Sequence, residues 1–151
     1  MVKRIIGVIG ASRADGKELE LAEQTGKLIA ERGAVLVCGG LGGVMEAAAR
    51  GAKSAGGLTI GILPQSTKEM ANNYIDVPIA TGFGEARNVI IVRSADAVIA
   101  IGGEYGTLSE IAFALKMGKP VIGINTWNIK GIVEAGAPDT AIDKAFELLI
   151  S

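Results

Sequence analysis

The chain has 151 residues, a net charge of −1, 49% hydrophobic residues and 4% aromatic residues. This length predicts a single domain with an aliphatic core. The lack of a basic excess argues against nucleic acid as a partner, and no apolar run reaches the roughly 18 residues of a membrane span. The opening apolar run is too short for a signal peptide, so we expect a cytoplasmic protein without a nucleic-acid or membrane partner.

The sequence contains one cysteine, Cys38, and no histidine. A single cysteine cannot form an intrachain disulfide, and its apolar neighbours predict a buried thiol in a reducing compartment. Without histidine, a Ser-His-Asp triad, a Cys-His pair and the usual zinc ligand sets are excluded. We therefore expect no metal site and no required cofactor.

Short aliphatic runs alternate with stretches of helical periodicity along the chain. The predicted strands are residues 5–9, 34–38, 58–63, 75–79, 97–101 and 121–124. The first predicted helix carries Leu21, Ala22, Thr25, Leu28, Ile29 and Arg32 at helical spacing and stops at Gly33. Further helices are predicted at residues 44–55, 85–94 and 138–149, and another has Leu108, Ile111, Ala112 and Leu115 on one face and ends at Gly118. This order predicts an α/β fold, with a mainly parallel sheet covered by helices on both faces.

The secondary structure of three segments does not follow from periodicity alone. Residues 85–94 contain a β-branched run that suits a strand, yet the strand at 97–101 follows almost at once and favours a helix. Pro78 lacks a backbone N–H, which places the strand at 75–79 at an edge or near its own end. Residues 65–74 are polar and predict a loop.

Glycine-rich loops follow three of the predicted strands, at residues 10–12, 39–43 and 102–107. The carboxyl ends of parallel strands share one edge, where ligands bind near the topological switch point. Backbone N–H groups in glycine loops form anion sites, so these loops predict a phosphate. The candidate ligand residues are Gly10, Ser12, Gly39, Gly40, Gly42, Gly43, Gly102, Gly103, Gly106 and Thr107. The alternative is that the glycines only permit tight turns.

The common nucleotide-binding motifs are absent. Gly16-Lys17 is followed by Glu18, which does not complete a P-loop, and residues 7–12 do not form a clean G-x-G-x-x-G pattern. A dinucleotide or a P-loop triphosphate is therefore not the expected ligand. Ser12 and Asp15 have a second interpretation as residues that begin the first helix.

Four ordered blocks, at residues 39–47, 85–88, 95–100 and 102–110, resemble the LONELY GUY superfamily, whose members were long labelled lysine decarboxylases. The segment GGEYGTLSE at residues 102–110 is most similar to the molybdenum-cofactor carrier branch and its bacterial relatives. The resemblance extends over about residues 5–124 and implies a Rossmann-like fold and a homo-oligomer, dimer or tetramer. With no linker in the sequence, we expect residues 1–151 to form a single Rossmann-like three-layer domain. The resemblance also implies one of two activities: hydrolysis of nucleoside 5′-monophosphates to base and ribose 5-phosphate, or binding of a phosphorylated pterin.

The hydrolase branch carries a P-G-G-x-G-T-x-x-E motif and an upstream Arg-Lys pair. By the resemblance, Arg87 and Glu110 match the catalytic arginine and glutamate, if this chain is a hydrolase. Asn88 replaces the lysine, Gly102 replaces the proline, and Glu104 replaces the second glycine. A carboxylate in a phosphate loop would repel the ligand, which sets this chain apart from the hydrolases.

Both candidate catalytic residues also have structural interpretations. Residues 107–110 fit a capping box, in which Glu110 bonds back to the Thr107 N–H, and Arg87 fits a solvated residue at a helix start. In a hydrolase, a carboxylate would stabilise the oxocarbenium-like state or activate water, while Arg87 would hold phosphate or orient the glutamate. Tyr105 is suited to stacking on a ring or to packing, and Trp127 to an interface.

The sequence thus supports a binding protein for a phosphorylated nucleotide-like ligand, with molybdenum cofactor or a nucleoside monophosphate as candidate ligands. The first alternative is a nucleoside 5′-monophosphate phosphoribohydrolase, an N-glycosidic bond hydrolase and not a lysine decarboxylase. The second alternative is a regulatory sensor whose oligomeric state responds to a nucleotide. Fold alone does not choose among the three.

Overall fold

The computed structural model describes residues 2–150 and has one seven-stranded sheet. The strands are β1 (Ile5–Gly10), β2 (Val35–Cys38), β3 (Thr59–Leu63), β4 (Val77–Ala80), β5 (Ala97–Ile101), β6 (Val121–Ile124) and β7 (Val133–Glu134). The helices are α1 (Gly16–Glu31), α2 (Val44–Ser54), the short 3-10 helix η1 (Gly84–Ala86), α3 (Arg87–Ser94), α4 (Tyr105–Lys116) and α5 (Pro138–Ile150).

The strand order is β4-β3-β2-β1-β5-β6-β7, and every neighbouring pair is parallel. The chain builds outward from β1 to β4 and then crosses back to place β5 on the other side of β1. The topological switch point therefore lies between β1 and β5, where Gly10 pairs with Ile101 at the carboxyl ends. This is the crevice in which an open parallel sheet of this kind binds its ligands.

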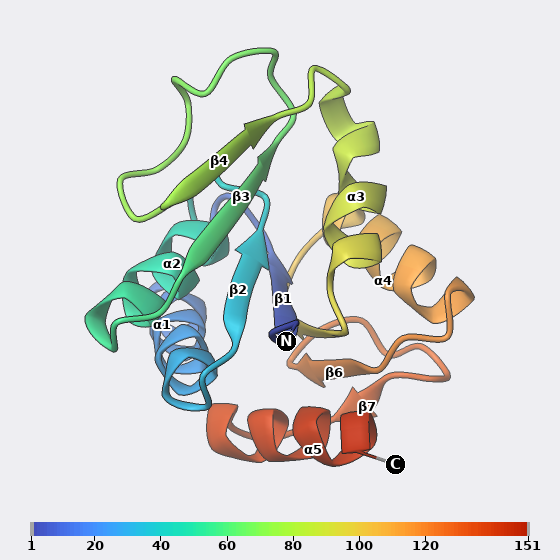
Figure 1. Cartoon of the computed structure of the whole chain (residues 1–151). Helices are drawn as coiled ribbons and strands as arrows, with labels where there is room; N and C mark the ends of the chain where they lie inside the picture. Colours follow the sequence, from blue (N-terminus) through green and yellow to red (C-terminus); the bar gives the residue numbers. More distant parts are fainter. Residues whose placement is uncertain (1, 151) are drawn as a thin grey trace.

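Helices cover both faces of the sheet (Figure 1). Ile6 and Val8 of β1 join a core cluster with residues of α1, α2 and α5, whereas Ile9 joins a second cluster with residues of α3 and α4. Successive strand residues point to opposite faces, so one buried strand supplies both cores. The predicted α/β class, a Rossmann-like three-layer arrangement, is confirmed.

Helices α1 and α2 approach closely because glycines lie at their contact. A Cβ on Gly26 would lie 1.9 Å from the carbonyl oxygen of Ala48, and a Cβ on Gly51 would lie 1.9 Å from that of Glu23. Any side chain at either position would collide with backbone, so the two helices can touch only through glycine. These two glycines hold α2, and with it the loop at 39–43, against the rest of the protein.

The strands differ from the prediction at the C-terminal edge and at β4. The two-residue strand β7 is too short to leave a periodic signal in the sequence. Strand β4 covers Val77–Ala80 and not residues 75–79, and it forms the edge that Pro78 indicates. The loop between β3 and β4 contains the predicted polar segment 65–74.

The helices at 85–94 and 138–149 are confirmed, the first as η1 followed by α3. The predicted face of α4 is partly wrong: Ile111 is buried and Leu115 packs on the core, but Ala112 is exposed, and the buried line also contains Thr107, Glu110 and Ala114. The face is displaced because α4 buries a threonine and a glutamate toward the sheet, and hydrophobic periodicity gives no weight to polar side chains.

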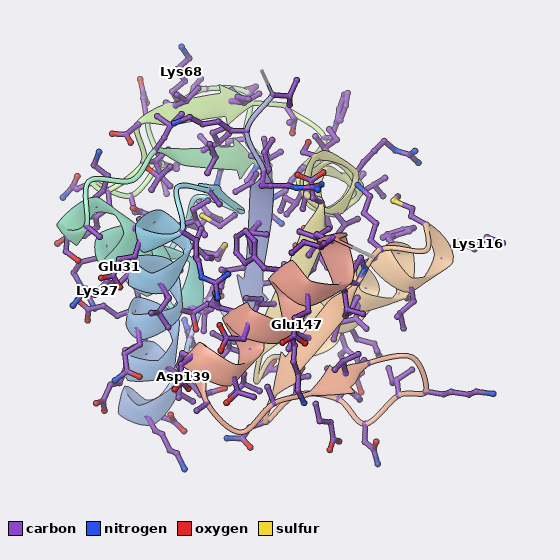
Figure 2. The ribbon with its side chains drawn as sticks, turned by 60° about the horizontal axis from the view of Figure 1, so that its bottom comes forward. Lys27, Glu31, Lys68, Lys116, Asp139 and Glu147 are labelled. Atoms are coloured by element: carbon purple, nitrogen blue, oxygen red, sulfur yellow. The ribbon has the colours of Figure 1, made fainter. Side chains whose placement is uncertain are left out.

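The charged residues labelled in Figure 2 lie on the outer sides of the helices and loops. Lys27 and Glu31 project from α1, and Lys68 projects from the loop before β4. Within residues 2–150, every helix falls short of the length and apolar character needed to cross a membrane.

Candidate functional site

The loops after β1 and β2 pack against each other at the carboxyl edge of the sheet. The Val44 N–H donates to the carbonyl of Ala11 over 3.0 Å, which joins the start of α2 to the loop at 10–12. Gly43 has φ of +63°, and a Cβ there would lie 2.3 Å from the Ala11 oxygen. Two of the predicted glycine loops are therefore brought together, and Gly43 serves both conformation and close approach.

The third loop continues the same edge after β5. Gly103 has φ of +101°, and a Cβ there would lie 2.4 Å from the Thr107 Oγ1. Thr107 is itself buried, while Glu104 and Gly106 are exposed. The loop at 102–107 is thus a tight glycine turn over the first turn of α4.

A carboxylate that the sequence did not indicate lies at the switch point. Glu18 of α1 completes a capping box with Asp15, and a Cβ on Gly102 would lie 1.6 Å from the Glu18 Oε2. Asp15 therefore begins α1, as one interpretation predicts. The negative charge of Glu18 would repel an anion near Gly102. An anion is therefore more favourable at the part of the sheet edge near Gly39.

Arg87 reaches the loop after β2 from the first position of α3. A Cβ on Gly39 would lie 2.7 Å from the Arg87 Nη2, so the guanidinium lies directly over this glycine. Arg87 Nη1 donates to the Asn88 Oδ1, whereas Nε is buried and has no hydrogen-bond partner. Burial lowers the pKa of Arg87, and nearby Glu110 opposes that effect. Arg87 is half-buried, so the interpretation as a fully solvated residue is wrong.

Glu110 lies on the buried face of α4 and is 7% exposed. Burial raises the pKa of Glu110 to about 8, against the opposing charge of Arg87. At neutral pH this carboxyl is therefore mostly protonated and can donate a hydrogen bond or a proton.

The predicted capping box at residues 107–110 is wrong. Helix α4 begins at Tyr105 with Glu104 as the N-cap, and no side chain caps it by a hydrogen bond. Thr107 lies within the first turn of α4, and Glu110, one turn later, is on the same buried face. Glu110 is consequently free for a role that helix capping would have excluded.

Two amide side chains that sequence reasoning missed hold the site together. Asn88 is 5% exposed and donates from Nδ2 to the Ser109 Oγ over 3.2 Å. Asn72 donates from Nδ2 to the Leu41 carbonyl over 2.8 Å, which ties the loop after β3 to the glycine loop after β2. The sequence marked Asn88 only as the replacement for the lysine of the Arg-Lys pair, and Asn72 only as part of a polar loop.

Cys38 ends β2 beside this site and is fully buried, as predicted. Its Sγ lies 3.8 Å from the carbonyl of Met45, and burial raises the pKa of Cys38 to about 11. A thiol with this pKa is a poor nucleophile at neutral pH, so Cys38 acts as an apolar filler.

The exposed side of the loop at 102–107 carries an aromatic pair. Tyr105 stacks on Trp127 at 6.1 Å between ring centroids, and the Trp127 Nε1 donates to the Glu104 carbonyl over 3.2 Å. Tyr105 is 81% exposed, and the Glu104 side chain is exposed as well. The pair fixes the Glu104 backbone in place.

Two cavities adjoin the edge. One of about 370 Å³ has in its lining Ser12, Arg13, Gly43 and Arg50, so it touches both packed glycine loops. A larger one of about 480 Å³ lies beyond β6 and β7 and includes Trp127 in its lining. Among residues 2–150, no three Cys, Asp or Glu side chains gather in a way that could hold a metal ion.

Comparison with known proteins places this geometry in a family. The model of the SLOG cluster4 family matches residues 3–147. The chain belongs to the SLOG cluster4 family. This assignment agrees with the resemblance to the LONELY GUY superfamily.

This SLOG cluster4 protein is similar to three others that bear on its role. A protein of Archaeoglobus fulgidus is 58% identical over 119 residues, 79% of this chain and 78% of the relative. The structure of the molybdenum cofactor binding protein from Rippkaea orientalis is 43% identical, with a TM-score of 0.94 over 100% of this chain and 99% of that chain. The cytokinin riboside 5′-monophosphate phosphoribohydrolase of Mycobacterium tuberculosis is 36% identical over 127 residues, 78% of this chain and 67% of the relative.

Proposed function

We propose that this SLOG cluster4 protein binds a phosphorylated, nucleotide-like ligand at the carboxyl edge of its sheet and carries it without cleaving it. The observation that carries the proposal is the Arg87 guanidinium over Gly39, with a buried Nε–H that has no partner. A buried N–H without a partner is costly, and a ligand oxygen would satisfy it. The phosphate would lie beside Arg87 at the loop at 39–43.

Similarity supports molybdenum cofactor as the ligand of this carrier. The resemblance to the Rippkaea orientalis protein extends over both chains almost completely, whereas the hydrolase relative is matched over two thirds of its length. Asn88 and Glu104 also depart from the hydrolase motif, and Glu18 adds a carboxylate at the switch point. The departures at Asn88 and Glu104 remove a cation and add a negative charge relative to the hydrolase motif.

A hydrolase is the second candidate, and one observation favours it. Glu110 is buried near Arg87 and its raised pKa of about 8 keeps a proton available at neutral pH. Such a carboxyl could protonate the leaving base of a nucleoside 5′-monophosphate, or stabilise the sugar cation once ionised.

Two measurements on the purified protein separate the candidates. The first is the fluorescence of any co-purifying pterin, together with calorimetric binding of AMP. The second is release of free base and ribose 5-phosphate from a panel of nucleoside 5′-monophosphates. Saturable binding without turnover, weakened in Arg87→Ala, is expected for a carrier. Turnover that is lost in both Arg87→Ala and Glu110→Gln would instead establish the hydrolase, and absence of any binding would contradict both.

A further inference from the structure

A directional chain of hydrogen bonds links Arg87 to the loop at 102–107. Arg87 Nη1 donates to the Asn88 Oδ1, and the Asn88 Nδ2 donates to the Ser109 Oγ. The Ser109 hydroxyl in turn donates to the Gly106 carbonyl over 2.6 Å. A guanidinium can only donate, so the Asn88 oxygen must face Arg87 and its NH₂ must face Ser109. The orientation of this buried amide is therefore determined by its partners.

Asn88 holds Arg87 in a way that the carboxylate across the site does not. In the described part of the chain, no salt bridge within 4 Å joins Arg87 to Glu110, although their charges influence each other. Nη2 lies over Gly39, and Nε has no partner. The amide of Asn88 is thus the hydrogen-bonding group that sets how the guanidinium is turned.

The choice of Nη1 by Asn88 determines which edge of the guanidinium remains for a ligand. The Nε–H and the neighbouring Nη2 form a planar pair of donors that suits two oxygens of one phosphate. With Nη1 occupied, Nε and Nη2 are the unpaired donors; Nη2 lies against Gly39 of the loop at 39–43, and Nε is buried.

We propose that Asn88 is a positioning residue, which fixes the Arg87 guanidinium at the loop at 39–43 for contact with the ligand phosphate and couples it through Ser109 to the loop at 102–107. The proposal rests on the proposed function, because it concerns the same site. Asn88 is uncharged, and its role in this proposal is to hold the Arg87 guanidinium in one orientation by accepting a hydrogen bond from Nη1.

The first test observes Arg87 directly and needs no ligand. In the ¹⁵N NMR spectrum of the full chain, the Arg87 Nε–H signal is assigned by its loss in Arg87→Lys. We expect slow exchange with water in the unaltered protein and in Asn88→Asp, which keeps an acceptor for Nη1. In Asn88→Ala we expect this exchange to be at least about tenfold faster. In Ser109→Ala we also expect faster exchange, because the Asn88 amide loses its second hydrogen-bond partner. Unchanged exchange in both would overturn the proposal.

The second test measures the affinity for AMP by calorimetry in a double-mutant cycle. Asn88→Ala should weaken binding about tenfold in the unaltered background and less than about twofold in Arg87→Ala, since the positioned group is then gone. Asn73→Ala, at an exposed asparagine, is the matched control and should leave affinity unchanged. An equal loss in both backgrounds would mean that Asn88 only stabilises the fold, which overturns the proposal.

The two tests also distinguish failure of this inference from failure of the proposed function. If the unaltered protein binds AMP while Asn88→Ala changes neither exchange nor affinity, only the positioning role is wrong. If no AMP binds, and yet the Arg87 Nε–H exchanges faster in Asn88→Ala, then Asn88 orders the arginine but the proposed phosphate site is not one. That second result would overturn the ligand part of this proposal together with the proposed function.

Discussion

Arg87 and Glu110 share one buried site, and burial determines the charge of each. Burial lowers the pKa of Arg87 and raises the pKa of Glu110 to about 8, while each charge opposes the effect of burial on the other. Arginine stays charged at any physiological pH, so the protonation of Glu110 is the variable part of the site. This residue is where pH should act on both stability and ligand binding.

The raised pKa of Glu110 predicts a pH dependence of stability. Between the ordinary value of 4.5 and about 8, folded Glu110 keeps a proton that the unfolded chain has released. The free energy of unfolding should therefore fall as pH rises through this window, by up to about 1.4 kcal/mol per pH unit. In Glu110→Gln this contribution should vanish.

The measurement is urea unfolding at several pH values from 4 to 9, for the unaltered protein and the variant. Glu31→Gln, at the exposed end of α1, is the control and should retain the full dependence (Figure 2). Parallel profiles for the unaltered protein and Glu110→Gln would show that Glu110 titrates normally and would remove its special status.

The N-termini of α1 and α4 differ in their capping, which allows a direct comparison of its effect on stability. The Asp15 side chain accepts from the Glu18 N–H over 2.8 Å, whereas Glu104 begins α4 without a side-chain cap. Asp15→Ala should destabilise the protein by about 1 kcal/mol, and Glu104→Ala by less than about 0.5 kcal/mol. Chemical denaturation of both variants tests this, and equal losses would mean that the capping box contributes nothing.

The contact between α1 and α2 predicts that a better helix former will destabilise the protein. Gly26→Ala favours the helix by about 1 kcal/mol in propensity, yet its Cβ would collide with the Ala48 carbonyl. We expect a net loss of about 2 kcal/mol or more, since the helices must separate. Gly16→Ala, with open space around its Cβ, is the control and should be neutral or stabilising. A gain of stability in Gly26→Ala would contradict the packing.

One continuous sheet connects both cores, which predicts cooperative unfolding of the whole molecule. Trp127 follows β6, so its fluorescence reports on the side of the sheet opposite to β4. The expectation that residues 1–151 form a single domain requires this signal and the helical circular dichroism to change together in urea. Two separate transitions would show that β6, β7 and α5 unfold as an independent unit.

A homo-oligomer, dimer or tetramer, stays a prediction at this scale. Large apolar side chains are exposed at the β4 edge and just after it, at Val77, Ile79 and Phe83. Sedimentation of the purified protein at several concentrations would measure the oligomeric state directly.

Much of the fold and part of the site could be predicted from the sequence, because they depend on patterns that are local in the chain. Aliphatic runs with glycine at their ends predict buried strands and turns, and their alternation with helices predicts a parallel sheet. Asp15 and Gly33 mark the two ends of the first helix in the same way. The ordered blocks around Arg87 and Glu110 likewise carry the family resemblance within the sequence itself.

Only the tertiary structure decided how these parts meet. Residues 107–110 match the capping-box pattern, yet no such box forms, because α4 begins two residues before Thr107 and buries the face that carries Glu110. Glu18 reaches Gly102 from another part of the chain, and Asn88, which holds Arg87, donates to Ser109 at a separation of 21 residues. Burial, pKa and orientation are set by such distant neighbours, and so the chemistry of the site emerges only when the strands are placed side by side.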